Sequence, residues 1–94
     1  MTVSFSSRTL VPPHVLVRQL ERETVLLNLD TERYFGLDEI GTRMWFRLTG
    51  SDSIEMAYEK LLSEWEVDGL VLRQNLTELL DQLVSNGLLD VASG

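Results

Sequence analysis

The sequence predicts an α+β domain in which a three-stranded antiparallel sheet is followed by three helices. Two patterns carry this prediction. Residues 14–37 are rich in β-branched and aromatic residues, whereas residues 38–86 carry apolar residues at helical spacing. A chain of 94 residues has room for one domain. We therefore expect residues 1–94 to form a single unit, with its core at about 13–91.

Three segments in the first part of the chain are predicted strands: residues 14–20, 24–29 and 33–37. Two prolines favour extended backbone before the first. In the second, Val25, Leu27 and Leu29 share one face at period two. Short polar turns separate the strands. Since turns of this length return the chain beside itself, the strands are expected to be antiparallel.

The rest of the chain contains three amphipathic segments that predict helices: after Asp38 up to Gly50, from Ile54 to Trp65, and from Leu70 to Asn86. Asp38 is a suitable N-cap, and Gly50 suits a helix end. Gly87 is expected to adopt a left-handed cap, after which residues 88–91 return as coil or a short strand. Strands followed by helices in this order give a winged-helix-like outline.

Composition excludes several functional classes. Acidic residues outnumber basic ones by 15 to 8, giving a net charge of −7, and there is no cysteine. Such a surface repels nucleic-acid phosphates and anionic lipids, and the chain has no thiol chemistry. The start of the chain lacks the basic and long apolar regions of an export signal. We expect a cytoplasmic protein that binds neither nucleic acid nor membrane.

The sequence offers no convincing catalytic or cofactor-binding constellation. His14 is the only histidine and is expected to be an ordinary surface residue. The acidic pairs Asp38/Glu39 and Glu64/Glu66 lack the spacing of a calcium loop. Neither a phosphate-binding glycine loop nor a serine with an accompanying base is present. We predict a protein that is not an enzyme and holds no cofactor or metal.

A winged-helix outline invites comparison with DNA-binding regulators, whose third helix reads the groove. Here the third helix has one basic residue, Arg73, against Glu78 and Asp81. That charge balance does not suit phosphate neutralisation. A transcriptional regulator or dimerising adaptor remains the alternative function, and salt-dependent DNA binding would support it.

Two features instead point to peptide binding. The third strand carries Tyr34-Phe35-Gly36, with Arg33 as its one charged guard, and edges of this kind can accept an added strand. On the third helix, Asn75 and Gln82 flank a stripe of four leucines: Leu72, Leu76, Leu79 and Leu83. Ordinary core packing explains the central leucines, Tyr34 and Phe35 equally well.

Residues 25–45 resemble the PqqD-like family of recognition elements for ribosomally made, post-translationally modified precursor peptides. The shared features are an apolar strand, an aromatic-glycine-leucine strand, and a helix with a small residue and Trp45. The third-helix pattern continues through Asn75-Leu76, Leu79-Leu80 and Gly87-Leu88-Leu89. Asp38 replaces a common asparagine. Asn75 replaces a usual aspartate, so a charged contact cannot be transferred to that position.

The resemblance implies that a leader peptide adds as a strand to the third strand and lies against the third helix. Its contacts would be Glu32, Arg33, Tyr34, Phe35 and Gly36, facing a wall of Leu72, Asn75, Leu76, Leu79 and Gln82. The chain is most similar to stand-alone members from lasso-peptide clusters, which implies a separate cysteine leader peptidase and a cyclase as partners. A pyrroloquinoline quinone precursor is the alternative client, and the bare edge allows a weak homodimer.

Overall fold

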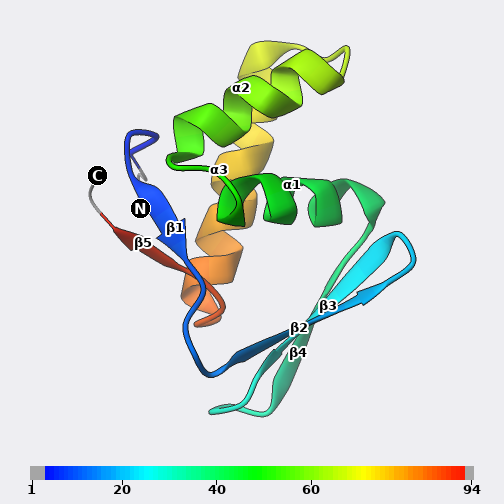
Figure 1. Ribbon diagram of the computed structural model, residues 1–94, viewed down its shortest axis with the longest axis vertical. Helices are drawn as coiled ribbons and strands as arrows, with labels where there is room; N and C mark the ends of the chain where they lie inside the picture. The colour runs from blue at the N-terminus through cyan, green and yellow to red at the C-terminus, as the bar shows by residue number, and fades with distance from the viewer. Residues whose placement is uncertain (1–3, 93–94) are drawn as a thin grey trace.

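The computed structural model describes residues 4–92 and contains two sheets and three helices (Figure 1). The strands are β1 (Arg8–Leu10), β2 (Val15–Leu20), β3 (Glu23–Asn28), β4 (Arg33–Leu37) and β5 (Asp90–Ala92). The helices are α1 (Glu39–Thr49), α2 (Ile54–Glu64) and α3 (Gly69–Ser85). The predicted α+β order is confirmed, and the three predicted strands and three helices lie within one residue of their expected positions.

The main sheet has the order β2-β3-β4, and both pairs are antiparallel. The turn between β2 and β3 has only two residues, so Leu20 lies opposite Glu23. From there the register is regular: Leu16 faces Leu27, and Leu27 in turn faces Tyr34. Because β3 is central, β2 and β4 are the edges of this sheet.

The face of the main sheet that meets the core is set by the alternate residues of β3. Thr24, Leu26 and Asn28 are buried, whereas Val25 and Leu27 are half-buried on the opposite, outer face. Alternation alone marked Val25 and Leu27 as one row, but it did not say which row faces the helices. Because both rows of β3 contain apolar residues, the buried row is the one against which the helices pack.

Each helix begins at a side-chain cap. The Asp38 carboxylate accepts the Gly41 N–H at 2.7 Å, Ser53 Oγ accepts the Met56 N–H, and Asp68 accepts two N–H groups of α3. At the other end of α3, Gly87 has φ +68°, which confirms the predicted left-handed cap. These caps fix the helix bounds that position the rest of the fold.

The core lies between the inner face of the main sheet and the three helices. Trp45 and Leu48 of α1, Ile54 and Leu61 of α2, and Leu26 of β3 are almost fully buried in it. From α3 the buried residues are Leu72, Leu76, Leu80 and Leu83. The predicted stripe therefore differs at one position: Leu80 is in the core, and Leu79 is only partly buried at its margin.

The second sheet has two strands, of which the sequence indicated one: β5 confirms the short strand expected among residues 88–91, whereas β1 and its pairing with β5 were not predicted. β1 pairs antiparallel with β5, which places Thr9 opposite Val91 and joins the two ends of the chain (Figure 1). The segment before β1 also caps α2: the Ile54 and Glu55 N–H groups donate to the Ser7 and Phe5 carbonyls at 2.8 Å. A three-residue strand such as β1 carries too little pattern to be recognised from sequence.

Candidate functional site

The outer edge of β4 is unpaired within the part of the chain that the structure describes. Its free hydrogen-bonding groups follow from the two-residue turn, which makes Leu20–Glu23 a hydrogen-bonded pair. Because successive residues of β3 direct their N–H and C=O groups to opposite sides, those of Leu26 bond Phe35 of β4. The N–H and C=O groups of Tyr34 and Gly36 consequently point away from the sheet, ready to bond another strand.

The side chains of β4 divide between two environments. Phe35 points inward and is partly buried against the core, whereas Tyr34 is 73% exposed on the outer face. Glu32, Arg33 and Gly36 are also exposed. The predicted strand residues thus form one continuous, accessible edge.

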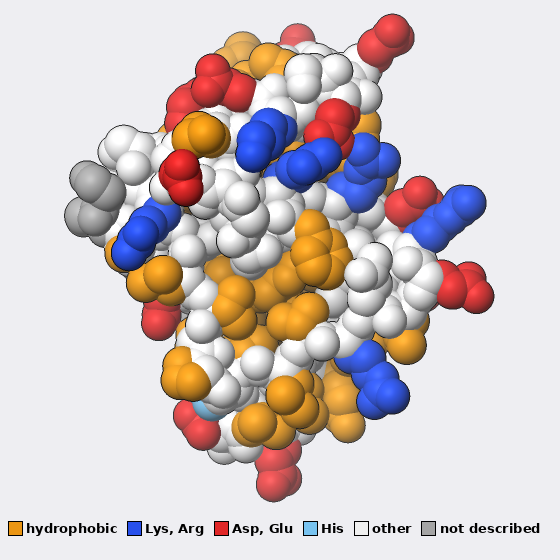
Figure 2. Space-filling model, viewed as in Figure 1, with side chains coloured by type: hydrophobic (Ala, Val, Ile, Leu, Met, Phe, Trp, Pro, Cys, Tyr) orange, Lys and Arg blue, Asp and Glu red, His pale blue; other side chains and the backbone are white. Residues whose placement is uncertain are grey.

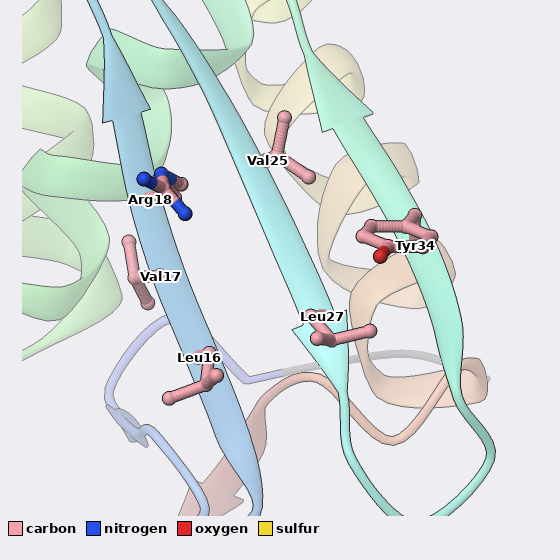
Figure 3. Close-up of a pocket in the computed structure, with 6 residues that line it drawn as sticks. All are labelled: Leu16, Val17, Arg18, Val25, Leu27 and Tyr34. Atoms are coloured by element: carbon pink, nitrogen blue, oxygen red, sulfur yellow. The ribbon is translucent and has the colours of Figure 1, made fainter.

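Helix α3 runs beside β4 in the opposite direction. Two surface pockets show this, because one joins the start of β4 to the end of α3 and the other lies near the end of β4 and the start of α3. One pocket joins Asn28, Thr31 and Arg33 to the end of α3 at residues 85–87. The other, of about 440 Å³, lies where β4 passes into α1 and α3 begins. One pocket includes Arg33 at the start of β4, and the other lies beside α1, which follows β4; Figure 3 shows α3 behind β4 in the same relation. We refer to the region between β4 and α3 as the groove.

The pocket at the start of α3 is mainly apolar. Ile40 and Met44 come from α1, and Val71, Leu72 and Asn75 come from α3. The pocket is completed by Glu64 at the end of α2 and by the three residues that follow it: Trp65, Glu66 and Val67. Such a pocket suits an aliphatic or aromatic side chain, whose full burial contributes about 1.5–3 kcal/mol.

The predicted wall residues of α3 occupy two different layers. Asn75, Leu79 and Gln82 recur at i, i+4 and i+7 and are exposed or half-buried along the groove. The same row leads to Asn86, whose carbonyl accepts a hydrogen bond from Asn28 at 2.9 Å. Leu76, at 0% exposed, and Leu72, at 2%, lie beneath this row in the core. Leu72 also forms the floor of the apolar pocket.

Sequence reasoning missed the residues that other elements bring to the groove. Ile40 shares a helical face with Met44 and Leu48 by its spacing, yet unlike these buried residues it is 58% exposed at the pocket rim. Val71 is also exposed, and its apolar character at the start of α3 was the one visible sign of a surface there. Trp65 and Val67 gave no such sign, because their positions depend on how α2 meets α3.

A cluster of charges fixes one wall of the apolar pocket. Arg43 of α1 donates to Glu64 at the end of α2 at 2.6 Å, and Arg47 pairs with the other carboxylate oxygen. The hydrogen bond from Arg43, together with the nearby Arg47, holds the pKa of Glu64 below its ordinary value despite partial desolvation. Arg43 also stacks over Trp65, 5.6 Å from the ring centroid.

A polar cluster closes the opposite end of the groove. His14 Nε2 lies 2.9 Å from the Gly87 carbonyl, and its Nδ1 lies 3.7 Å from Asp30. Asn28 accepts the N–H groups of Asp30 and Thr31 through its side-chain oxygen. His14 was expected to be an ordinary surface residue; its side chain is instead partly buried and links the residue before β2 to the turn after α3.

Residues 4–92 contain no group of three or more histidine, cysteine, aspartate or glutamate side chains that could hold a metal ion. Within the same residues, no helix is long and apolar enough to cross a membrane. On the face seen in Figure 2, charged side chains of both signs lie over the upper half and at the outline, and a group of hydrophobic side chains lies at the centre below α1.

Comparison with known proteins agrees with this geometry. Residues 23–89 match the family described as coenzyme PQQ synthesis protein D. The chain belongs to the PqqD family. The matched residues include β3, β4 and all three helices, and thus both elements that border the groove.

Two solved structures have the same fold as this PqqD family member, each with a TM-score of 0.79. TbiB1, in complex with the TbiA(beta) leader peptide, is 31% identical over 85% of this chain and 93% of its own. A lasso peptide synthetase B1, complexed with the leader peptide, is 24% identical over 88% of this chain and 98% of its own. No curated protein matched the sequence.

Proposed function

We propose that this PqqD family member captures the leader segment of a ribosomal precursor peptide, as a strand added to β4. The observation that carries the proposal is the free edge of β4 running beside α3, with an apolar pocket at its end. The likeness to TbiB1, which was solved with a leader peptide, supports a leader peptide as the ligand. The fold shared with a lasso peptide synthetase B1 and the sequence resemblance to members from lasso-peptide clusters favour a lasso-peptide precursor as the client. The family's description keeps a pyrroloquinoline quinone precursor as the alternative client.

Recognition would combine backbone and side-chain contacts. The N–H and C=O groups of Tyr34 and Gly36 would bond the added strand, while Glu32 and Arg33 border its end. Alternate side chains of the leader would face Phe35, Asn75, Leu79 and Gln82 in the groove. Leu72 and Leu76 would support that wall from within the core.

The bound precursor would then be processed by other proteins. A cysteine leader peptidase and a cyclase are the partners we propose for a lasso pathway in the cytoplasm, with this chain as the non-catalytic recognition subunit. When no leader is bound, two β4 edges could pair and form a weak homodimer.

The DNA-binding alternative has less support in the structure. Arg73, the one basic residue of α3, lies 4.3 Å from the Phe5 ring centroid and 4.4 Å from that of Tyr58. Its guanidinium also bonds both carboxylate oxygens of Glu55 at 3.1 Å. A side chain committed to these contacts is poorly placed to neutralise a phosphate.

The test is fluorescence anisotropy with a labelled leader segment of the precursor encoded beside this chain's gene. Ile40→Asp places a charge at the rim of the apolar pocket and should weaken binding by roughly ten- to a hundredfold. Met56→Asp makes the same change at an exposed apolar position on α2 and should leave binding within about twofold.

Circular dichroism should show both variants folded, since both positions are exposed. No leader binding by the folded wild-type chain at tens of micromolar would end the proposal. Equal losses in the two variants would mean that the peptide binds elsewhere.

A further inference from the structure

Gly36 lies in the middle of the exposed strand β4, where nothing in the free chain requires a glycine. Among the described non-helical glycines, Gly87 has positive φ, whereas Gly36 does not, so its backbone suits any residue. A Cβ built on Gly36 would meet nothing within 4 Å. Since glycine weakens a strand by its backbone entropy, the gap points to something that lies there in a complex.

We propose that Gly36 is a specificity-determining residue: its missing side chain lets an aromatic side chain of the bound strand lie across the outer face of the sheet onto Val25. The inference rests on the proposed strand addition to β4 and deepens it. It assigns a second surface, on the side of the sheet away from α3, that reads the peptide.

The direction of the peptide side chain follows from strand geometry. Gly36 pairs with Val25, which pairs with Arg18, so these three positions form one row on the outer face. A peptide residue opposite Gly36 would continue that row on the same face. Its Cβ would lie two strand spacings, about 9–10 Å, from that of Val25, with no side chain between them. An aromatic ring is the side chain suited to cover that distance.

The outer face supplies a surface for that ring. A hollow of about 360 Å³ is lined by residues of all three strands (Figure 3): Leu16, Val17, Arg18, Val25, Leu27 and Tyr34. The sticks in Figure 3 show Val25 lying between Arg18 on β2 and Tyr34 on β4. A ring over Gly36 would therefore touch Val25, border Tyr34 and approach the Arg18 guanidinium, which favours aromatic faces.

The hollow is continuous with the proposed peptide edge, because Tyr34 belongs to both and Gly36 of that edge pairs with Val25, which lines the hollow. This continuity favours the bound peptide over a separate protein as the occupant. The residues opposite Phe35 would point into the α3 groove, so the two faces would read alternate residues of one peptide.

The experiment is selection from a displayed library of random peptides on the immobilised full chain, for wild type, Gly36→Ala and Gly36→Val. Binding to wild type should enrich sequences with an aromatic residue at one fixed position. Replacing that residue by alanine should weaken binding of the synthetic peptide to wild type by roughly tenfold. The same replacement should have almost no effect with Gly36→Val, and an intermediate one with Gly36→Ala.

Gln19→Val is the matched control, because it introduces valine at an exposed position of β2, the strand at the opposite edge of the sheet. It should select the same peptides as wild type. Thermal unfolding should show all variants folded, since a side chain at Gly36 meets open space; Gly36→Ala decides the test if Gly36→Val does not fold.

The outcomes separate this inference from the proposed function. Enriched peptides with the same aromatic preference for wild type and Gly36 variants would overturn the role of Gly36. Enriched peptides without an aromatic position would overturn it too. No enriched peptides for the folded wild-type chain would instead contradict strand addition itself.

Discussion

At the scale of single residues, neighbours on α3 have different tasks. Leu76 is fully buried and touches the core, whereas Leu79, less than one turn away, lies partly exposed at the groove. Both were expected in a peptide-binding wall. A change at Leu76 therefore acts first on folding, so any loss of peptide binding in such a variant reports a damaged core.

Leu76→Ala should lower the free energy of unfolding by about 2–5 kcal/mol, because it leaves a cavity among close-packed side chains. Urea denaturation followed by circular dichroism measures this change. Leu79→Ala is the control and should cost clearly less, since Leu79 is already partly exposed. Equal losses of stability would contradict the division of α3 into a core row and a groove row.

At the scale of elements, the apolar pocket depends on the junction of α1 and α2. Arg43 and Arg47 of α1 both bind Glu64 at the end of α2. The residue that follows, Trp65, lines the pocket and stacks against Arg43. The charges therefore hold the two helix ends together and, through them, set one wall of the pocket.

The Glu64 contacts predict a pH-dependent stability. Because the arginines lower the folded-state pKa of Glu64, their contribution is fully present above its ordinary value of 4.5. It is lost as the pH falls through the lowered folded-state pKa. Wild type should thus be more stable than Glu64→Gln near pH 7, and the difference should shrink in the acid range.

Thermal unfolding of both proteins over this pH range gives the comparison. Glu55→Gln serves as the control, since Glu55 pairs with Arg73 away from the α1–α2 junction. A stability difference between wild type and Glu64→Gln that stays constant down to pH 2 would contradict the assignment.

At the scale of the whole molecule, the chain ends close the fold. β1 pairs with β5 at the two ends of the chain. Thr9 donates to the Leu48 carbonyl at 2.8 Å, and the carbonyls of Phe5 and Ser7 cap α2. The N-terminal segment thereby links α1, α2 and β5, all of which are distant from it in sequence.

Removing residues 1–10 should lower the melting temperature by several degrees, with about 4–8 °C expected per kcal/mol lost in a domain of this size. The loss follows from the unpaired β5 and the uncapped start of α2. Differential scanning calorimetry measures it. An unchanged melting temperature would show that the segment contributes nothing to stability.

The sequence by itself determined the order of strands and helices, because alternation, helical periodicity and caps are local properties. Asp38, Gly50 and Gly87 end or begin elements where expected. The sequence also showed that the β4 edge has few charged residues to protect it and that α3 carries an apolar stripe. These features sufficed to predict the fold class and to indicate a strand edge as the candidate site.

Only the tertiary structure decided which residues of these elements face a partner. Leu76 and Leu79 have the same side chain, yet packing buries one and leaves the other at the groove. Ile40 and Trp65 reach the pocket only because α1 and α2 meet there, and Gly36 has significance only beside Val25. Such contacts join residues distant in sequence, so no local pattern encodes them.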